Sequence, residues 1–167
     1  AVWDSAERTL FLARDRLGVK PLYYQIHGKD LYYASEIKCL VQRPDFEKKI
    51  SMEALSHYLT YRNVPAPLTI YETVFSLLPG ECLVFENGAA KKWKYWRVDF
   101  SKQEPVPEGE AIERITEMLH DAVRLRMISD VPVGAYLSGG VDSSLIVALM
   151  MQMAAKPIKT FSLAYEE

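Results

Sequence analysis

The sequence has no long hydrophobic run and no excess of either charge. No stretch approaches the roughly 18 consecutive apolar residues of a membrane-spanning helix. Its 20 basic and 22 acidic residues leave a formal net charge of −2, which is too weak for a dedicated nucleic-acid or membrane-surface binder. The first residues also lack the basic start and apolar core of a secretion signal. We therefore expect a cytoplasmic protein that binds neither nucleic acid nor membranes.

Metal-ligating and nucleophilic side chains are also sparse. The only two cysteines, Cys39 and Cys82, do not form a metal-ligand spacing, and we expect both to be reduced and buried. Three histidines are scattered, and none is paired with a cysteine or carboxylate at a ligand spacing. The sequence therefore predicts no structural metal site and no catalytic residue.

What is present is an ordinary globular composition, with 49% hydrophobic and 25% charged residues. The sequence begins without methionine, inside what reads as a strand, and its last residues read as another strand. We therefore expect the sequence to be part of a longer polypeptide.

Short apolar runs joined by tight turns dominate the first hundred residues. Gly28 and the pair Asn87-Gly88 mark two hairpin turns, since these residues accept positive φ angles. Ser35 and Ser51 are expected to cap two short helices. The predicted strands are Thr9–Ala13, Leu22–Ile26, Leu31–Ala34, Cys82–Phe85 and Lys92–Trp96.

The pattern changes after this region. Residues 98–107 are polar and contain two prolines, which indicates a linker between domains at 1–97 and 108–167. Apolar residues at helical spacing then follow from residue 110. Next come a strand at Val131–Leu137, a buried helix at Leu145–Ala154 and a strand at Lys159–Tyr165. This order predicts a β-loop-α-β unit with a parallel sheet.

The loop of this unit carries the clearest chemical signal. Its residues are Ser138, Gly139, Gly140, Val141, Asp142, Ser143 and Ser144. Glycines let backbone N–H groups approach a ligand, and the start of the following helix favours anions. The carboxylate of Asp142 would repel phosphate unless Mg²⁺ lay between them. The alternative is a glycine-rich turn in which Asp142 and Ser143 only cap a helix.

The loop, with Leu137 before it, resembles the pyrophosphate-binding loop of the ATP-pyrophosphatase superfamily. The preceding residues, Arg126–Tyr136, resemble glutamine-hydrolysing asparagine synthetases. Two earlier motifs, Ala13–Tyr24 and Ala34–Lys38, resemble the later part of the same family's class II glutaminase domain, which belongs to the N-terminal-nucleophile type. The resemblance implies an antiparallel, β-rich partial glutaminase domain followed by the first β-loop-α-β unit of the synthetase domain.

The resemblance also implies a ligand set. The family binds ATP through this loop, which assigns residues 138–144 to phosphate, Asp142 to Mg²⁺, and the backbones of Leu137 and Leu163 to adenine. The family adenylates aspartate, releases pyrophosphate and lets glutamine-derived ammonia attack the acyl-adenylate. We therefore expect ATP, aspartate and glutamine as ligands, Mg²⁺ as the metal, and the remainder of the enzyme, as a homodimer, as partners.

The sequence departs from the family at its first residue. The family's glutaminase nucleophile is an N-terminal cysteine, whereas residue 1 is alanine. We therefore expect this stretch alone to be inactive, although its parent is a carbon–nitrogen ligase. Two alternatives stay open: a relative that adenylates a different carboxylate, in surface-polymer or β-lactam synthesis, and a non-catalytic interaction module with the same fold.

Overall fold

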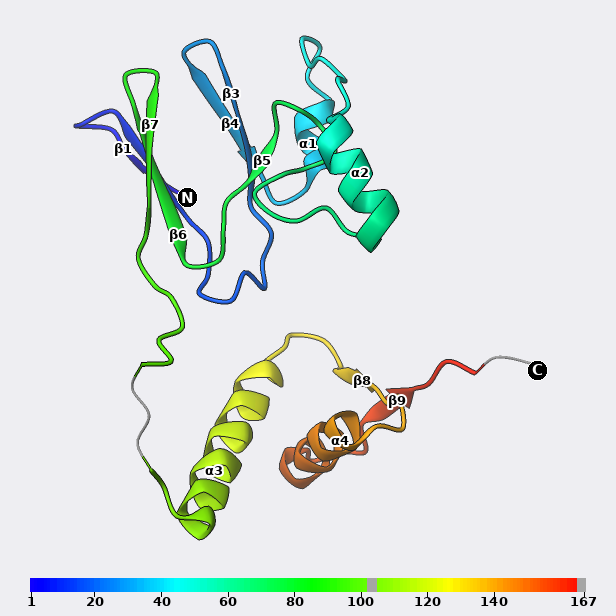
Figure 1. Ribbon diagram of the computed structural model, residues 1–167. Helices are drawn as coiled ribbons and strands as arrows, with labels where there is room; N and C mark the ends of the chain where they lie inside the picture. Colours follow the sequence, from blue (N-terminus) through cyan, green and yellow to red (C-terminus); the bar gives the residue numbers. More distant parts are fainter. Residues whose placement is uncertain (102–104, 165–167) are drawn as a thin grey trace. The chain divides into compact units, whose positions relative to one another are not determined.

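The computed structural model describes residues 1–101 and 105–164, and the chain divides into two compact units, 1–101 and 102–167 (Figure 1). Residues 102–104 of the expected linker and residue 165 of the last expected strand lie outside the described residues. No helix in the described part of the chain is long and apolar enough to cross a membrane.

Two antiparallel sheets form the first unit, as the hairpin turns predicted. One sheet has the order β1-β2-β6-β7, and the other has the order β4-β3-β5. Asn87 and Gly88 both have positive φ angles, of 51° and 79°, in the turn between β6 and β7. The strands are β1 (Val2–Asp4), β2 (Thr9–Ala13), β3 (Tyr23–His27), β4 (Asp30–Ala34), β5 (Phe75–Ser76), β6 (Glu81–Glu86) and β7 (Ala89–Lys94).

Two short helices, α1 (Ile37–Val41) and α2 (Met52–Tyr61), follow the hairpin of β3 and β4. The Ser51 hydroxyl accepts a hydrogen bond from the Ala54 amide at 3.2 Å, which confirms the predicted cap of α2. The cap predicted at Ser35 is wrong. The N-cap of α1 is Glu36, so Ser35 lies one residue too early for its hydroxyl to reach the free amides of the first turn.

The core of the first unit contains four buried side chains from both sheets and the segment before β6. Leu12 of β2 and Leu83 of β6 are fully buried and lie opposite each other in the strand register. Tyr24 of β3 and Leu77 complete the cluster. This contact fixes the strand that leads directly into the first family motif.

The second unit contains α3 (Glu108–Arg126), β8 (Gly134–Tyr136), α4 (Val141–Met153) and β9 (Lys159–Phe161). The two strands are parallel, in the register Ala135↔Thr160, and α4 connects them (Figure 1). The predicted parallel pairing is therefore confirmed. Val123 of α3 packs with Leu149 and Met150 of α4 in the core of this unit.

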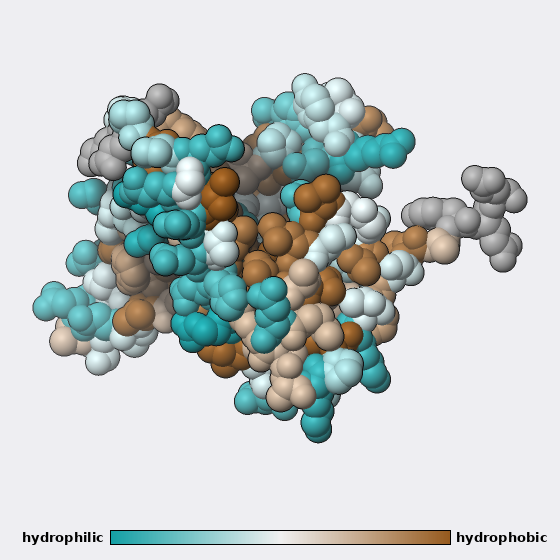
Figure 2. All heavy atoms as spheres, turned by 90° about the horizontal axis from the view of Figure 1, so that it is seen from below, coloured by the Kyte–Doolittle hydropathy of each residue, from teal (hydrophilic) through white to brown (hydrophobic). Residues whose placement is uncertain are grey.

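The expectation that 145–154 forms a buried helix is wrong for most of its length. Leu149 and Met150 are buried, but Leu145, Ile146 and Met151 are 44%, 37% and 45% exposed. Only α3 and the two-stranded sheet pack against α4, so the remaining apolar sides of the helix stay uncovered in the described residues. Figure 2 shows apolar side chains reaching the surface between hydrophilic ones.

Candidate nucleotide-binding site

The loop predicted to bind phosphate lies between the end of β8 and the start of α4. Gly139 has a φ of +81°, a conformation that side-chain-bearing residues rarely adopt, and no other atom lies within 4 Å of where a Cβ would stand. Gly140 is the N-cap of α4, and no side chain caps the helix. The side-chain hydrogen bonds by which Asp142 and Ser143 would cap this helix are absent among the described residues, so its first amides are left without a side-chain acceptor.

The serine hydroxyls bond to each other and to the loop backbone. Ser143 and Ser144 both donate to the Gly140 carbonyl, at 3.0 and 2.8 Å. The hydroxyls of Ser138 and Ser143 lie 3.0 Å apart. These bonds close the loop onto the first turn of α4, so residues 138–144 form one ordered structure.

Asp142 places an exposed carboxylate in the first turn of α4. Among the described residues, no group of three or more His, Cys, Asp or Glu side chains is close enough to hold a metal ion. A single carboxylate does not hold Mg²⁺ by itself, but Mg²⁺ commonly binds through one or two carboxylates together with phosphate oxygens. The donors present therefore fit Mg²⁺ that arrives with a polyphosphate, and do not fit a resident structural metal.

An apolar hollow of about 300 Å³ opens beside the loop and is lined by both predicted adenine positions, Leu137 and Leu163. Ser138 also lines it, together with Tyr136 and Phe161, whose rings lie 6.3 Å apart. Flat apolar surfaces of this kind suit a nucleobase. The hollow thus adjoins the start of the phosphate loop.

Ser162 is a site residue that sequence reasoning missed. Its hydroxyl donates to the Leu137 carbonyl at 2.6 Å, while the Leu137 amide donates to the Phe161 carbonyl at 2.9 Å. Both polar backbone groups of Leu137 are thus engaged, although its carbonyl keeps a second lone pair. The strand expected at Lys159–Tyr165 places Ser162 inside a strand, whereas β9 ends at Phe161, so no signal in the sequence pointed to this hydroxyl.

In the first unit, the motif containing Arg14 and Asp15 follows β2 and ties three segments together. The Arg14 guanidinium donates to Ser76 Oγ at 3.0 Å and to backbone carbonyls that include Leu77, at 2.7 Å. The Asp15 carboxylate accepts from the amides of Val19 and Lys20, both at 2.9 Å. These amide hydrogen bonds hold the pKa of Asp15 below its ordinary value.

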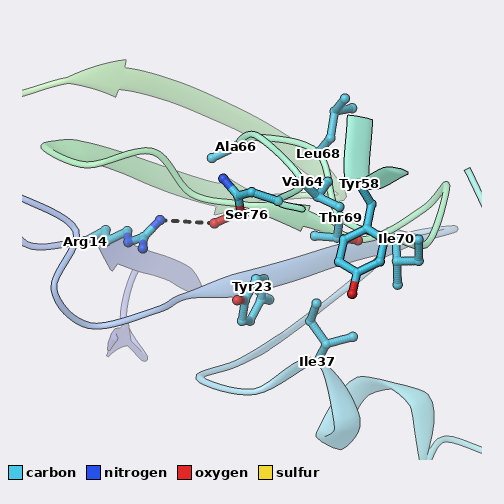
Figure 3. A pocket seen from close by; sticks show the side chains of 11 residues that line it. Arg14, Tyr23, Ile37, Tyr58, Val64, Ala66, Leu68, Thr69, Ile70 and Ser76 are labelled. Carbon is cyan, nitrogen blue, oxygen red and sulfur yellow. Dashed lines mark hydrogen bonds between the residues drawn. The ribbon is translucent and has the colours of Figure 1, made fainter. Parts of the chain in front are cut away.

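Arg14 also borders a cavity of about 560 Å³, shown in Figure 3. Tyr23 of β3, Ile37 of α1 and Tyr58 of α2 line other parts of the cavity. No cysteine, histidine or carboxylate is among the described residues that line it. The cavity is thus lined by the Arg14 guanidinium and by hydroxyls, without a thiol, imidazole or carboxylate.

Neither cysteine lines the cavity of the first unit. Cys82 is buried in β6, where burial raises the pKa of its thiol, and such a thiol is a poor nucleophile. Cys39 of α1 is exposed, so the expectation that both cysteines are buried is wrong for Cys39. Leu40 is the one buried residue of α1.

The comparisons with known families divide the chain in two. Residues 1–96 match the glutamine amidotransferase domain, and residues 114–167 match asparagine synthase. The chain therefore joins a glutamine amidotransferase domain to an asparagine synthase domain, in that order.

Curated relatives of the chain agree with this division. The chain is 36% identical to a putative glutamine-hydrolysing asparagine synthetase 2 of Methanocaldococcus jannaschii, over 99% of the chain and 33% of the relative. It is 35% identical to asparagine synthetase 3 of Bacillus subtilis, over 100% of the chain and 28% of the relative. It is also 32% identical to the amidase chry2 of Gibberella zeae, over 95% of the chain and 24% of the relative. The chain belongs to the glutamine-hydrolysing asparagine synthetase family, and it spans about a third or less of these relatives.

Proposed function

We propose that this chain is part of an asparagine synthetase, which adenylates aspartate with ATP and amidates it with ammonia from glutamine. The observation that carries the nucleotide assignment is the loop between β8 and α4. Gly139 has a positive φ angle, no side chain caps α4, and a single exposed carboxylate follows at Asp142. Unpaired amides at a helix start together with one carboxylate suit a polyphosphate bound with Mg²⁺.

In this proposal each part of the site has a separate task. Residues 138–144 hold the phosphates through backbone amides, while the serine hydroxyls close the loop onto the first turn of α4. Asp142 would hold Mg²⁺, which supplies charge compensation between that carboxylate and the phosphate oxygens. Leu137 and Leu163 border the hollow in which adenine would lie. These groups bind and orient ATP, while the aspartate site requires residues beyond those described.

Residues 1–97 would form the later part of the glutaminase domain. The motif at Ala13–Tyr24 builds structure here, since Arg14 and Asp15 direct their hydrogen bonds to neighbouring backbone and to Ser76. The catalytic cysteine would be supplied by a segment outside this sequence. The partners are then the remainder of the same enzyme and a second copy of it, as a homodimer.

The second candidate is a relative that adenylates another carboxylate. The similarity to the amidase chry2 supports this candidate, because that relative matches 95% of the chain and is not named an asparagine synthetase. The loop and the hollow would serve ATP equally in both cases. A panel of carboxylic acids, each tested for ATP- and ammonia-dependent pyrophosphate release by the full-length protein, separates the two candidates.

The proposal is tested by Asp142→Asn in the full-length protein. We expect pyrophosphate release to fall at least about tenfold, because the neutral side chain would no longer hold the Mg²⁺ that accompanies the phosphates. Glutamine hydrolysis should stay within about twofold of that of the unmodified protein. Glu113→Gln, which removes an exposed carboxylate from α3, is the matched control. Equal loss of both activities in Asp142→Asn would show a folding role and contradict the assignment.

A further inference from the structure

Leu137 is the last residue before the loop 138–144, and two consecutive residues hold it: Phe161 at the end of β9 and Ser162 directly after it. The paired register ends at Tyr136↔Phe161. Beyond it, the Leu137 amide donates to the Phe161 carbonyl, and the Ser162 hydroxyl donates to the Leu137 carbonyl at 2.6 Å. The Ser162 side chain thus extends the strand pairing by one hydrogen bond, directly at the boundary between strand and loop.

We propose that Ser162 is a positioning residue for the nucleotide loop, an inference that rests on the proposed function. The peptide bond between Leu137 and Ser138 is planar and trans, so the Leu137 carbonyl and the Ser138 amide point in opposite directions. A bond that fixes the carbonyl therefore fixes the direction of the Ser138 N–H. This N–H is the first donor of the loop in residues 138–144.

The constraint extends from Ser138 into α4. Ser143 donates its one hydroxyl proton to the Gly140 carbonyl, so Ser138 is the donor in the 3.0 Å contact between the hydroxyls of Ser138 and Ser143. The loop is consequently tied to β9 at its start and to the first turn of α4 at its end. Turning the Ser138 peptide would disturb both the first amide and the hydroxyl that closes the loop.

The role of Ser162 is separable from folding. Ser162 is exposed, so water can replace its hydroxyl at the Leu137 carbonyl without leaving a buried polar group unpaired. The bond from Leu137 to Phe161 remains and preserves the parallel pairing. Loss of the hydroxyl should therefore loosen the orientation of one peptide and leave the fold intact.

The test measures the dissociation constant of ATP in the presence of Mg²⁺ by calorimetry, using the full-length protein. Ser162→Ala is expected to bind ATP about fivefold more weakly, as for one lost neutral hydrogen bond, with an unchanged thermal unfolding midpoint. Ser162→Thr keeps the hydroxyl and should bind as the unmodified protein does. Ser129→Ala is the matched control. Ser129 is an exposed serine of the same unit, and its hydroxyl accepts a hydrogen bond from the Val131 amide, outside the loop.

Measuring Asp142→Asn in parallel separates the two proposals. If Asp142→Asn weakens ATP binding but Ser162→Ala does not, the role of Ser162 is overturned and the nucleotide assignment stands. Failure of Ser162→Thr to bind normally, or a lowered unfolding midpoint in Ser162→Ala, would also overturn the positioning role. If Asp142→Asn binds ATP–Mg²⁺ normally, the assignment of the loop fails, and the inference about Ser162 fails with it.

Discussion

At the scale of single residues, the loop that contains Gly139 and the motif that contains Asp15 both depend on backbone geometry that few substitutions preserve. Gly139 holds a φ of +81° in open space, so its requirement is conformational and not steric. Asp15 organises its loop through amide hydrogen bonds to both carboxylate oxygens. In both places the residue type is set by what the main chain must do, and the consequences can be measured separately.

Gly139→Ala should weaken ATP–Mg²⁺ binding about tenfold in the full-length protein, because alanine at this φ angle costs about 1 kcal/mol or more. The strain would push the loop out of the conformation proposed to bind phosphate. Gly109→Ala is the control: Gly109 lies in the first turn of α3 with free space around it, where alanine favours the helix. Unchanged ATP affinity in Gly139→Ala would argue against a backbone role of this glycine in binding.

The lowered pKa of Asp15 predicts how the first unit responds to acid. Because the folded-state pKa lies below the ordinary value of 3.8, ionised Asp15 stabilises the fold fully above that value. The contribution is lost as the pH falls below 3.8 through the lower, folded-state pKa. Asp15→Asn should therefore unfold at a lower urea concentration at pH 7, and the difference should shrink at pH 3.

Urea unfolding of the first unit can be followed by tryptophan fluorescence, because Trp3, Trp93 and Trp96 all lie in that unit. Asp30→Asn provides the comparison, since Asp30 is exposed in β4 and its carboxylate makes no hydrogen bond or ion pair within the described residues. The predicted link between the pKa of Asp15 and stability would be contradicted by one result. The urea midpoints of Asp15→Asn and the unmodified chain would then differ by the same amount at pH 7 and at pH 3.

At the scale of elements, the sequence predicted best where the local signal agreed with the tertiary contacts. Asn87-Gly88 fixed a hairpin because both residues accept positive φ, and the flanking strands pair as expected. The prediction of a cap at Ser35 was wrong because, from the sequence alone, either Ser35 or Glu36 could be the N-cap of the helix. The path of the chain into α1 makes Glu36 the N-cap. The hydrogen bond of Ser162 was not predictable, since it joins residues 25 positions apart.

Ser51→Ala should lower the free energy of unfolding of the first unit by about 1 kcal/mol, because one amide at the start of α2 loses its acceptor. Ser56→Ala, at an exposed position within the same helix, should leave stability unchanged or slightly raised. Both values come from urea denaturation followed by fluorescence. Equal stabilities of the two variants would contradict the cap.

At the scale of the whole molecule, the described residues build two compact units that differ in how well each covers its apolar groups. Leu12, Val74, Leu77 and Leu83 are fully buried in the first unit. In the second, only Val123, Leu149 and Met150 form the buried core, while Val141 and Leu163 are 84% and 82% exposed. The sequence predicts that α4 is apolar but does not predict what covers it, because burial depends on neighbouring residues that lie outside the local pattern.

A polypeptide of these 167 residues alone is therefore expected to associate or bind hydrophobic dyes, and to catalyse neither half of the proposed reaction. Two parallel strands provide the loop and one hollow, whereas adenylation of a carboxylate needs groups from both walls of a crevice at the strand ends. Glutamine hydrolysis needs an activated thiol, and the two present are a buried Cys82 and a Cys39 that does not line the cavity.

In the test, glutamate release is measured after this polypeptide is given glutamine. Pyrophosphate release is then measured after it is given aspartate, ATP, Mg²⁺ and ammonia. Glutamate or pyrophosphate release should not exceed that of an Asp142→Asn, Cys39→Ser control. Release above the control would show that the described groups suffice for catalysis. A monodisperse monomer that unfolds cooperatively without binding dye would show that the second unit closes its own core. The exposed apolar residues of α4 and Leu163 argue for the opposite result, since a surface of that kind is stable in water only when further protein covers it.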